Sequence, residues 1–302
     1  MNTKTKLSIF LLILTTLFSC NNSFNKLKKS AEKGDADAQY NLAWMYDIGD
    51  GIPIDNKQAH YWYKKSAEQG NADAQFYIAL MYSNGEGTPN DKRQAFYWCK
   101  KSAEQEHVKA QNNLASMYSN GEGTPIDERQ AFYWYKKSAE KGDAFAQFNL
   151  AFMYYIGEGT PTDKKQALYW YKKSAEQEHE KAQYNLAFMY FIGEGTPTDK
   201  KQAFYWYKKS AEQGNAFAQN NVANMYSDGE GTPTDKKQAF YWYKKSAEQG
   251  DSFAQYSLAL MYLNGEEIEI DKKQAAYWIR KSSENGFERA RDVWEEFELY
   301  NY

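Results

Sequence analysis

The chain has 302 residues and a formal net charge of −3, with 25% charged and 42% hydrophobic side chains. This mild acidity argues against a nucleic-acid partner, because nucleic-acid-binding domains usually carry a basic face. The only cysteines are Cys20 and Cys99, which excludes a fold held by a framework of internal disulfides. We expect Cys99 to be a buried structural thiol, because most other copies of the repeat described below have tyrosine in its place.

Residues 1–19 are typical of a secretory signal peptide. Two lysines precede an apolar run at residues 7–18, which is shorter than the roughly 17 to 25 residues needed to cross a bilayer. The run ends in Leu-Phe-Ser-Cys, which resembles the lipobox of bacterial lipoproteins. The resemblance implies cleavage before Cys20, acylation of that cysteine and a linker at residues 20–26 that tethers a soluble domain to the bacterial cell envelope. The alternative is an ordinary cleaved signal with an incidental cysteine.

The rest of the chain is an internal repeat with a period of 36 residues. An Ala-Gln pair recurs seven times at this spacing, and the pairs begin at residues 38, 74, 110, 146, 182, 218 and 254. A fixed period of roughly 20 to 50 residues is typical of stacked-repeat proteins, in which each unit buries its apolar face against its neighbours. We therefore expect residues 27–302 to form one all-α repeat domain without a separate catalytic domain.

Each repeat is predicted to be a hairpin of two helices. The constant face of the first helix in the first copy consists of Gln39, Leu42, Ala43 and Tyr46. Gly49 ends this helix, and Asp55 begins the second one with an Asp-x-x-Gln capping pattern. The full repeats are predicted at about residues 36–70, 71–106, 107–142, 143–178, 179–214, 215–250 and 251–286. No strand is expected.

Half-repeats are predicted at both ends of the repeat array. Residues 27–34 match the end of a second helix, and residues 287–300 match a first helix that caps the array. Counting these two half-units, we expect sixteen helices.

The repeat pattern resembles the Sel-1-like repeat, a relative of the tetratricopeptide repeat. The matching motif is Ala-Gln-x-x-Leu-Ala-x-Met-Tyr-x-x-Gly-x-Gly-x-Pro-x-Asp, followed by Ala-x-x-Trp-Tyr-x-Lys-x-Ala-Glu-x-Gly, in seven copies. This resemblance implies an α/α superhelical solenoid whose first helices line the concave side. It also implies an adaptor that binds a protein or peptide partner rather than an enzyme, and neither a cofactor nor a metal is expected.

The variable face of the first helices predicts where the partner binds. The positions that change between copies lie opposite the constant face, and in repeats four and five several of them are aromatic. We predict a binding groove formed by Tyr40, Trp44, Phe148, Phe152, Tyr155, Tyr184, Phe188 and Phe191, with the amides of Asn113, Asn149, Asn185 and Asn221 binding a peptide backbone. The alternative is that the aromatic rings pack between repeats and the asparagines bond neighbouring helices.

A tyrosine column on the second helices is the other repeated exposed feature. It consists of Tyr61, Tyr97, Tyr133, Tyr169, Tyr205, Tyr241 and Tyr277. We expect each ring to lie along lysine side chains, and the alternative is a convex association surface.

Two short motifs raise chemical alternatives. Ser138 and Lys141 match the Ser-x-x-Lys motif of penicillin-recognising enzymes, and cysteine-rich relatives of this repeat have been described as β-lactamases. Because Ser138 occupies a repeated column and no Lys-Thr-Gly motif is present, we expect no catalysis. A β-lactam- or peptidoglycan-acting hydrolase remains the alternative, and a structural envelope spacer is another. Glu106-His107 and Glu178-His179 contain metal-binding residue types, but we expect altered helix ends there.

Overall fold

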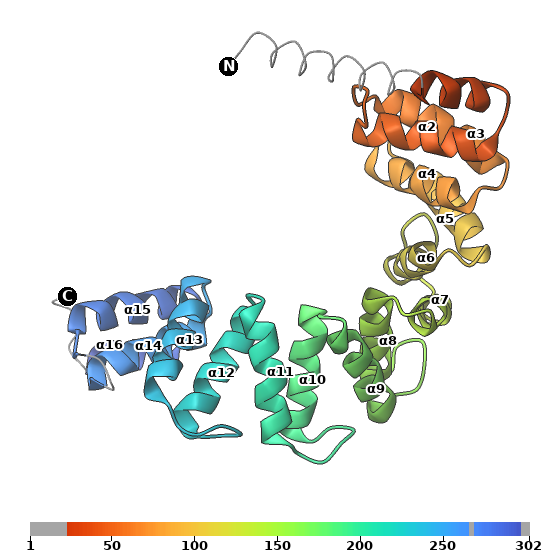
Figure 1. Cartoon of the computed structure of the whole chain (residues 1–302). Coiled ribbons are helices and arrows are strands. Elements are labelled where there is room, and N and C mark those ends of the chain that lie inside the picture. Colours follow the sequence, from red (N-terminus) through yellow and green to blue (C-terminus); the bar gives the residue numbers. More distant parts are fainter. Residues whose placement is uncertain (1–22, 266–268, 297–302) are drawn as a thin grey trace, which may run out of the picture. The chain divides into compact units, whose positions relative to one another are not determined.

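The computed structural model describes residues 23–265 and 269–296, and every regular element in these ranges is a helix (Figure 1). The predicted all-α class, with seven helical hairpins and no strand in the described residues, is confirmed. The predicted signal peptide at residues 1–19 and the predicted lipidation site Cys20 lie outside the described residues. None of the described helices combines the length and the apolar character required to span a bilayer.

First and second helices alternate along the chain. The helical segment 23–32 comes first, and the first helices of the repeats are then α2 (Ala36–Ile48), α4 (Ala72–Asn84), α6 (Val108–Asn120), α8 (Ala144–Ile156), α10 (Glu180–Ile192), α12 (Ala216–Asp228) and α14 (Ser252–Asn264). The second helices are α3 (Asn56–Glu68), α5 (Lys92–Glu104), α7 (Glu128–Glu140), α9 (Lys164–Glu176), α11 (Lys200–Glu212), α13 (Lys236–Glu248) and α15 (Lys272–Glu284). The last described helix is α16 (Arg289–Glu296), so the described residues contain the expected sixteen helices.

The C-terminal helix starts later than the sequence predicted. We expected it to begin at residue 287, whereas α16 begins at Arg289. Its predicted end at residue 300 lies outside the described residues.

Polar residues at the helix ends explain why each hairpin breaks where it does. The Asp35 carboxylate caps α2 by accepting the backbone N–H of Ala38, and Gly49 closes it in the left-handed conformation with its N–H donated to Met45. Asp55 caps α3 by accepting the N–H groups of Lys57 and Gln58. The predicted helix boundaries at Gly49 and Asp55 are therefore confirmed.

The capping pattern at the second helix differs from a capping box in one respect. In a capping box the glutamine side chain would accept the backbone N–H of the capping aspartate. Here the N–H of Asp55 donates instead to the carbonyl of Tyr46 at 2.9 Å, which ties the start of α3 to α2. The aspartate thus fixes both the start of the second helix and its distance from the first.

The chain divides into two compact units, and the division falls within α8. The first unit ends at Ala146 and contains the segment 23–32 and α2 to α7; the second begins at Gln147 and contains α9 to α16. Each unit has the same core of small and aromatic side chains. Leu42, Ala43, Ala59 and Tyr63 are completely buried in the first unit, and Leu186, Ala187, Ala203 and Tyr207 lie at the equivalent positions in the second.

Buried polar side chains join consecutive helices within each unit. The Ser66 hydroxyl donates to the carbonyl of Ala36 at 2.7 Å, and the same bond recurs from Ser102, Ser246 and Ser282. The Gln39 amide donates to the carbonyl of Ala31 at 3.0 Å. The serine and glutamine columns are therefore explained by the packing of helices in the repeat.

Candidate functional site

The candidate site is a hollow of about 210 Å³ in the second unit. It lies between α8 and α10, and the second helix α9 contributes one ring. Its walls are formed by Phe152, Tyr155, Tyr171, Tyr184, Asn185, Phe188 and Met189. We call this hollow the aromatic hollow. Five of its residues belong to the groove predicted from the sequence.

Phe152 and Phe188 are the exposed residues of the aromatic hollow. They retain 42% and 38% of their accessible surface, although both are large apolar side chains. They occupy equivalent positions in consecutive repeats, and Trp44, at the same position in the first unit, is 37% exposed. The prediction that these rings face away from the core is confirmed.

The prediction that Tyr40, Phe148 and Tyr184 also face outward is wrong. All three are half-buried, because their column lies at the edge of the helix that meets the next repeat. Phe148 stacks against His179, which caps the next first helix, with ring centroids 4.8 Å apart, and Tyr184 contacts Phe217 of the next repeat at 6.5 Å. The alternative of packing between repeats therefore holds for this column.

Tyr155 and Phe191 are half-buried too, and a lysine covers one face of each ring. The ammonium groups of Lys164 and Lys200 lie 3.1 Å from the centroids of Tyr155 and Phe191, respectively. Glu194 pairs with Lys164 at 3.2 Å. Burial and the hydrogen bond to Glu194 raise the pKa of Tyr155 to about 12. The expectation that these two rings lie open in the groove is wrong, although Tyr155 does line the aromatic hollow.

The asparagines do not form a row of free amides. Asn185 is hydrogen-bonded to the Tyr171 hydroxyl, and Asn221 to the Tyr184 hydroxyl. Asn149 is half-buried, and Asn113 lies in a second hollow in the first unit. The prediction of peptide-binding amides is therefore wrong for Asn185 and Asn221, whose side chains bond neighbouring helices instead.

Sequence reasoning missed the contributions of Tyr171 and Met189. Tyr171 belongs to a column that is buried in every repeat and Met189 to one that is buried in all repeats but the first, and they are only 1% and 0% exposed. Their surfaces form the floor of the aromatic hollow because the side chains around them leave a gap. A helical wheel of one helix carries no signal for such a gap.

The tyrosines of the second helices pack against side chains of their own helices, as we expected from the sequence. The Tyr61 ring packs edge-on against Trp62 at 4.9 Å, and the ammonium of Lys65 lies 5.7 Å from its centroid. The tyrosines are 45% to 50% exposed, and the Tyr-Trp contact recurs in all seven repeats. Each ring thus has contacts within its own helix.

Both residues of the Ser-x-x-Lys motif make contacts with other segments of the repeat array. Ser138 is completely buried, and its hydroxyl donates to the carbonyl of Val108 at 3.0 Å. The ammonium of Lys141 donates to the carbonyl of Glu106 and lies 3.3 Å from its carboxylate. The lysine is therefore paired with Glu106.

The Glu-His pairs are altered helix ends, as expected. The Nδ1 atoms of His107 and His179 accept the backbone N–H groups of Ala110 and Ala182, in the place of the usual Asn or Asp cap. Glu106 and Glu178 take the left-handed conformation that glycine has in the other repeats. Within the described residues no group of three or more His, Cys, Asp and Glu side chains is arranged to hold a metal ion.

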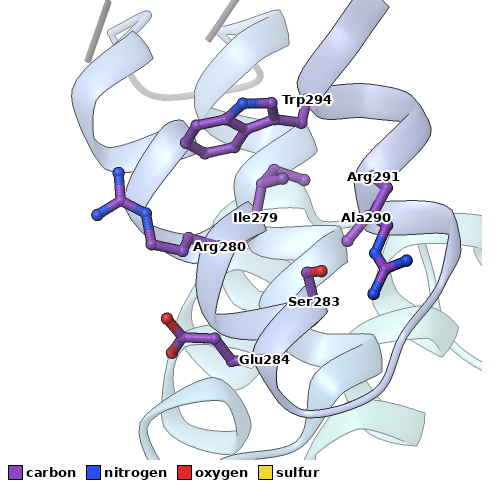
Figure 2. A pocket seen from close by; sticks show the side chains of 7 residues that line it. All are labelled: Ile279, Arg280, Ser283, Glu284, Ala290, Arg291 and Trp294. Atoms are coloured by element: carbon purple, nitrogen blue, oxygen red, sulfur yellow. The ribbon is translucent and has the colours of Figure 1, made fainter. Parts of the chain in front are cut away.

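A larger hollow, of about 340 Å³, lies between α15 and α16 (Figure 2). Figure 2 shows the Trp294 ring near Arg280 and Ile279, and the Arg280 guanidinium lies 5.4 Å from the ring centroid.

Comparison with known proteins identifies the repeat. The Sel1 repeat family model matches seven consecutive segments, at residues 36–71, 72–107, 108–143, 144–179, 180–215, 216–251 and 252–287. Among proteins with curated descriptions, none is similar enough to this chain to count as a relative.

Two solved structures are similar over most of the chain. A protective antigen present in uropathogenic Escherichia coli strains is 36% identical over 88% of this chain, with a TM-score of 0.84. This chain covers 57% of the length of that protein. A Sel1 repeat protein from Oxalobacter formigenes is 31% identical, with a TM-score of 0.72, over 92% of this chain and 80% of the other.

Proposed function

Because the chain belongs to the Sel1 repeat family, we propose that it is a non-catalytic scaffold that binds a protein or peptide partner through the aromatic hollow. The observation that carries this proposal is the exposure of Phe152 and Phe188 beside a preformed hollow of about 210 Å³. Large apolar side chains that stay exposed next to a concavity are typical of binding sites.

The chemistry of the hollow favours an apolar side chain of the partner. Lys164 lies over the Tyr155 ring, and Asn185 is bonded to Tyr171, so the nearest polar groups already have partners. Burying one aromatic ring against a partner contributes roughly 1.5 to 3 kcal/mol. The partner therefore gains most from inserting an aliphatic or aromatic side chain between Phe152 and Phe188.

The double variant Phe152→Ala/Phe188→Ala tests this proposal. We expect its affinity for a partner captured from envelope extract to fall at least about tenfold, which corresponds to about 1.4 kcal/mol. The matched control is Tyr169→Ala/Tyr205→Ala, which removes two rings of 50% and 49% exposure from second helices of the same repeats. If both double variants bind equally well, or if the control alone loses the partner, the aromatic hollow is not the binding site.

We also propose that the protein is a lipoprotein anchored through Cys20 in the bacterial cell envelope. The signal-like segment with its lipobox-like end supports this location. The similarity to a protective antigen present in uropathogenic Escherichia coli strains supports it as well, because an envelope location makes a protein accessible to antibodies. Cells fed a fatty-acid analogue should label the wild type but not Cys20→Ala. Equal labelling of the two proteins would contradict the anchor.

A hydrolase that uses Ser138 and Lys141 is the competing proposal. The burial of Ser138 and its bond to Val108 favour the scaffold. A fluorescent penicillin should leave the protein unlabelled, and labelling that disappears in Ser138→Ala would establish the hydrolase instead. A purely structural spacer, the third candidate, would give no specifically enriched partner in the capture experiment.

A further inference from the structure

The first unit contains a hollow at the same place in the repeat as the aromatic hollow. It has a volume of about 140 Å³, lies between α4 and α6 with a contribution from α5, and we call it the Cys99 pocket. Six of its ten lining residues correspond to residues of the aromatic hollow at a spacing of 72 residues. Cys99 stands where Tyr171 does, Ser116 where Phe188 does, and Asn113 where Asn185 does.

Tyr171 shows what normally fills this position. Its ring is 1% exposed, and its hydroxyl is hydrogen-bonded to Asn185. Five repeats have a tyrosine in this column, namely Tyr63, Tyr135, Tyr171, Tyr207 and Tyr243. The two exceptions are Cys99 in the second repeat and Ile279 in the seventh, and Cys99 lacks the ring and the hydroxyl.

The replacement leaves both a space and an unused polar group. The Cys99 thiol donates to the carbonyl of Ala110 in α6 at 3.4 Å, but it lacks the ring and the hydroxyl with which Tyr171 reaches Asn185. The side-chain amide of Asn113 lines the pocket and has no hydrogen-bond partner among the residues that the structure describes. Asn113 is half-buried, so its amide is available to a ligand that enters the pocket.

We propose that the Cys99 pocket binds a phenol ring, such as the tyrosine side chain of a protein partner. The ring would occupy the space that Tyr171 fills two repeats later, and its hydroxyl would bond Asn113 as the Tyr171 hydroxyl bonds Asn185. The rim suits a polar aromatic group, because Ser83 and Ser116 take the places of the aromatic Tyr155 and Phe188.

The charges at the rim are already neutralised. Lys92 pairs with Glu122 at 2.9 Å and donates to the Ser83 hydroxyl at 3.0 Å. A neutral phenol therefore fits better than a charged ligand. This proposal does not rest on the function of the aromatic hollow, which lies in the other unit.

The test compares 4-fluorophenol with fluorobenzene by ¹⁹F NMR on the full chain. The two probes differ by one hydroxyl. Because small ligands bind weakly, the test uses ratios of dissociation constants between probes and between variants rather than their absolute values. We expect 4-fluorophenol to bind about fivefold more tightly than fluorobenzene, as one hydrogen bond predicts. Asn113→Ala should abolish this difference while leaving fluorobenzene binding unchanged.

Substitutions that fill the Cys99 pocket should weaken the binding of both probes. Cys99→Tyr introduces the residue of the other repeats and should weaken 4-fluorophenol binding at least about tenfold. Ser116→Phe introduces the ring found at Phe188, narrows the pocket from its rim without touching the core, and should act in the same way. Cys99→Ala is the control that keeps the pocket open and should retain binding.

Binding must also survive Phe152→Ala/Phe188→Ala, which separates this site from the aromatic hollow. If 4-fluorophenol binding is lost in that double variant, or persists in both filled variants, the Cys99 pocket is not the phenol site. Absence of binding to the wild type would overturn the proposal as well.

Discussion

The side-chain amide of Gln213 donates a 2.8 Å hydrogen bond to the side-chain oxygen of Gln183, thirty residues earlier. Gln183 itself donates to the backbone carbonyl of Ala175 at 3.2 Å. One buried glutamine thereby joins the second helix of its own repeat to the second helix of the preceding one. Equivalent bonds link Gln69 to Gln39, Gln105 to Gln75 and Gln249 to Gln219, which explains why the Ala-Gln pair recurs in every copy.

Replacing Gln183 should therefore destabilise the second unit. Gln183→Ala removes two hydrogen bonds at a site that is 2% exposed, and we expect a loss of about 2 kcal/mol in the free energy of unfolding. Gln202→Ala, at an exposed position in the same repeat, should change it by less than about 0.5 kcal/mol. Urea unfolding of the two variants gives the comparison, and equal losses would mean that the glutamine bonds contribute little.

The two kinds of aromatic residue in the hollow should respond differently to truncation. Tyr171→Ala removes an almost completely buried ring and should cost about 3–5 kcal/mol of stability. Phe188→Ala, at 38% exposure, should cost about 1 kcal/mol or less. Thermal unfolding of both single variants measures this contrast. A large loss in Phe188→Ala would identify that ring as core and contradict its assignment to a binding surface.

Nearly all of the fold could be predicted from the repeat period and from the residues at the turns. Asp55 and Gly49 repeat with little change, and their effects are local, because a cap acts on the helix to which it belongs. The helix boundaries and the buried stripe were predictable for this reason. The altered helix end at His107 was also predictable, because this residue lies between two predicted helices.

The site was less predictable, because a helical wheel places a residue around one helix and omits the neighbouring repeat. Phe148 and Phe152 lie on the same variable side of α8, yet Phe148 meets His179 while Phe152 stays exposed. The Cys99 pocket depends in the same way on what a missing tyrosine leaves between two helices. Such gaps are set by the distance between repeats, which no pattern within one helix specifies.

The turn between the two helices of a repeat should tolerate alanine at one glycine and not at the next. Gly85 and Gly87 both have positive φ, so each alanine incurs a backbone cost of about 1 kcal/mol. A Cβ at Gly85 makes only ordinary contacts, the nearest being 3.4 Å from the Asn90 nitrogen, whereas a Cβ at Gly87 would overlap the backbone carbonyl of Asn56.

Gly87→Ala should therefore lose about 1–3 kcal/mol more unfolding free energy than Gly85→Ala. The two sites lie two residues apart in one turn, so the difference isolates the close approach to the preceding repeat. Chemical denaturation of both variants provides the measurement, and similar stabilities would show that the turn moves to accommodate the methyl group.

The histidine cap of α6 should make stability depend on pH. Burial lowers the pKa of His107 below its ordinary value of about 6.5, although Asp73, 3.2 Å from Nε2, opposes this shift and Lys109 adds to it. The neutral Nδ1 accepts the backbone N–H of Ala110, and a protonated ring cannot. The unfolded chain therefore binds the proton more readily than the folded one, so this contribution to stability is complete above about pH 6.5 and is lost as the pH falls through the folded pKa.

His107→Asn supplies the control, because asparagine caps the equivalent helices α4 and α12 and does not titrate. Between about pH 8 and about pH 5, the wild type should lose stability relative to His107→Asn, and the two curves should run parallel above about pH 7. Urea unfolding at several pH values gives the difference directly, and the subtraction cancels the other titrating groups. If the wild type instead gains stability relative to the variant as the pH falls, then pairing of the imidazolium with Asp73 outweighs the loss of the cap, and the folded pKa of His107 is raised.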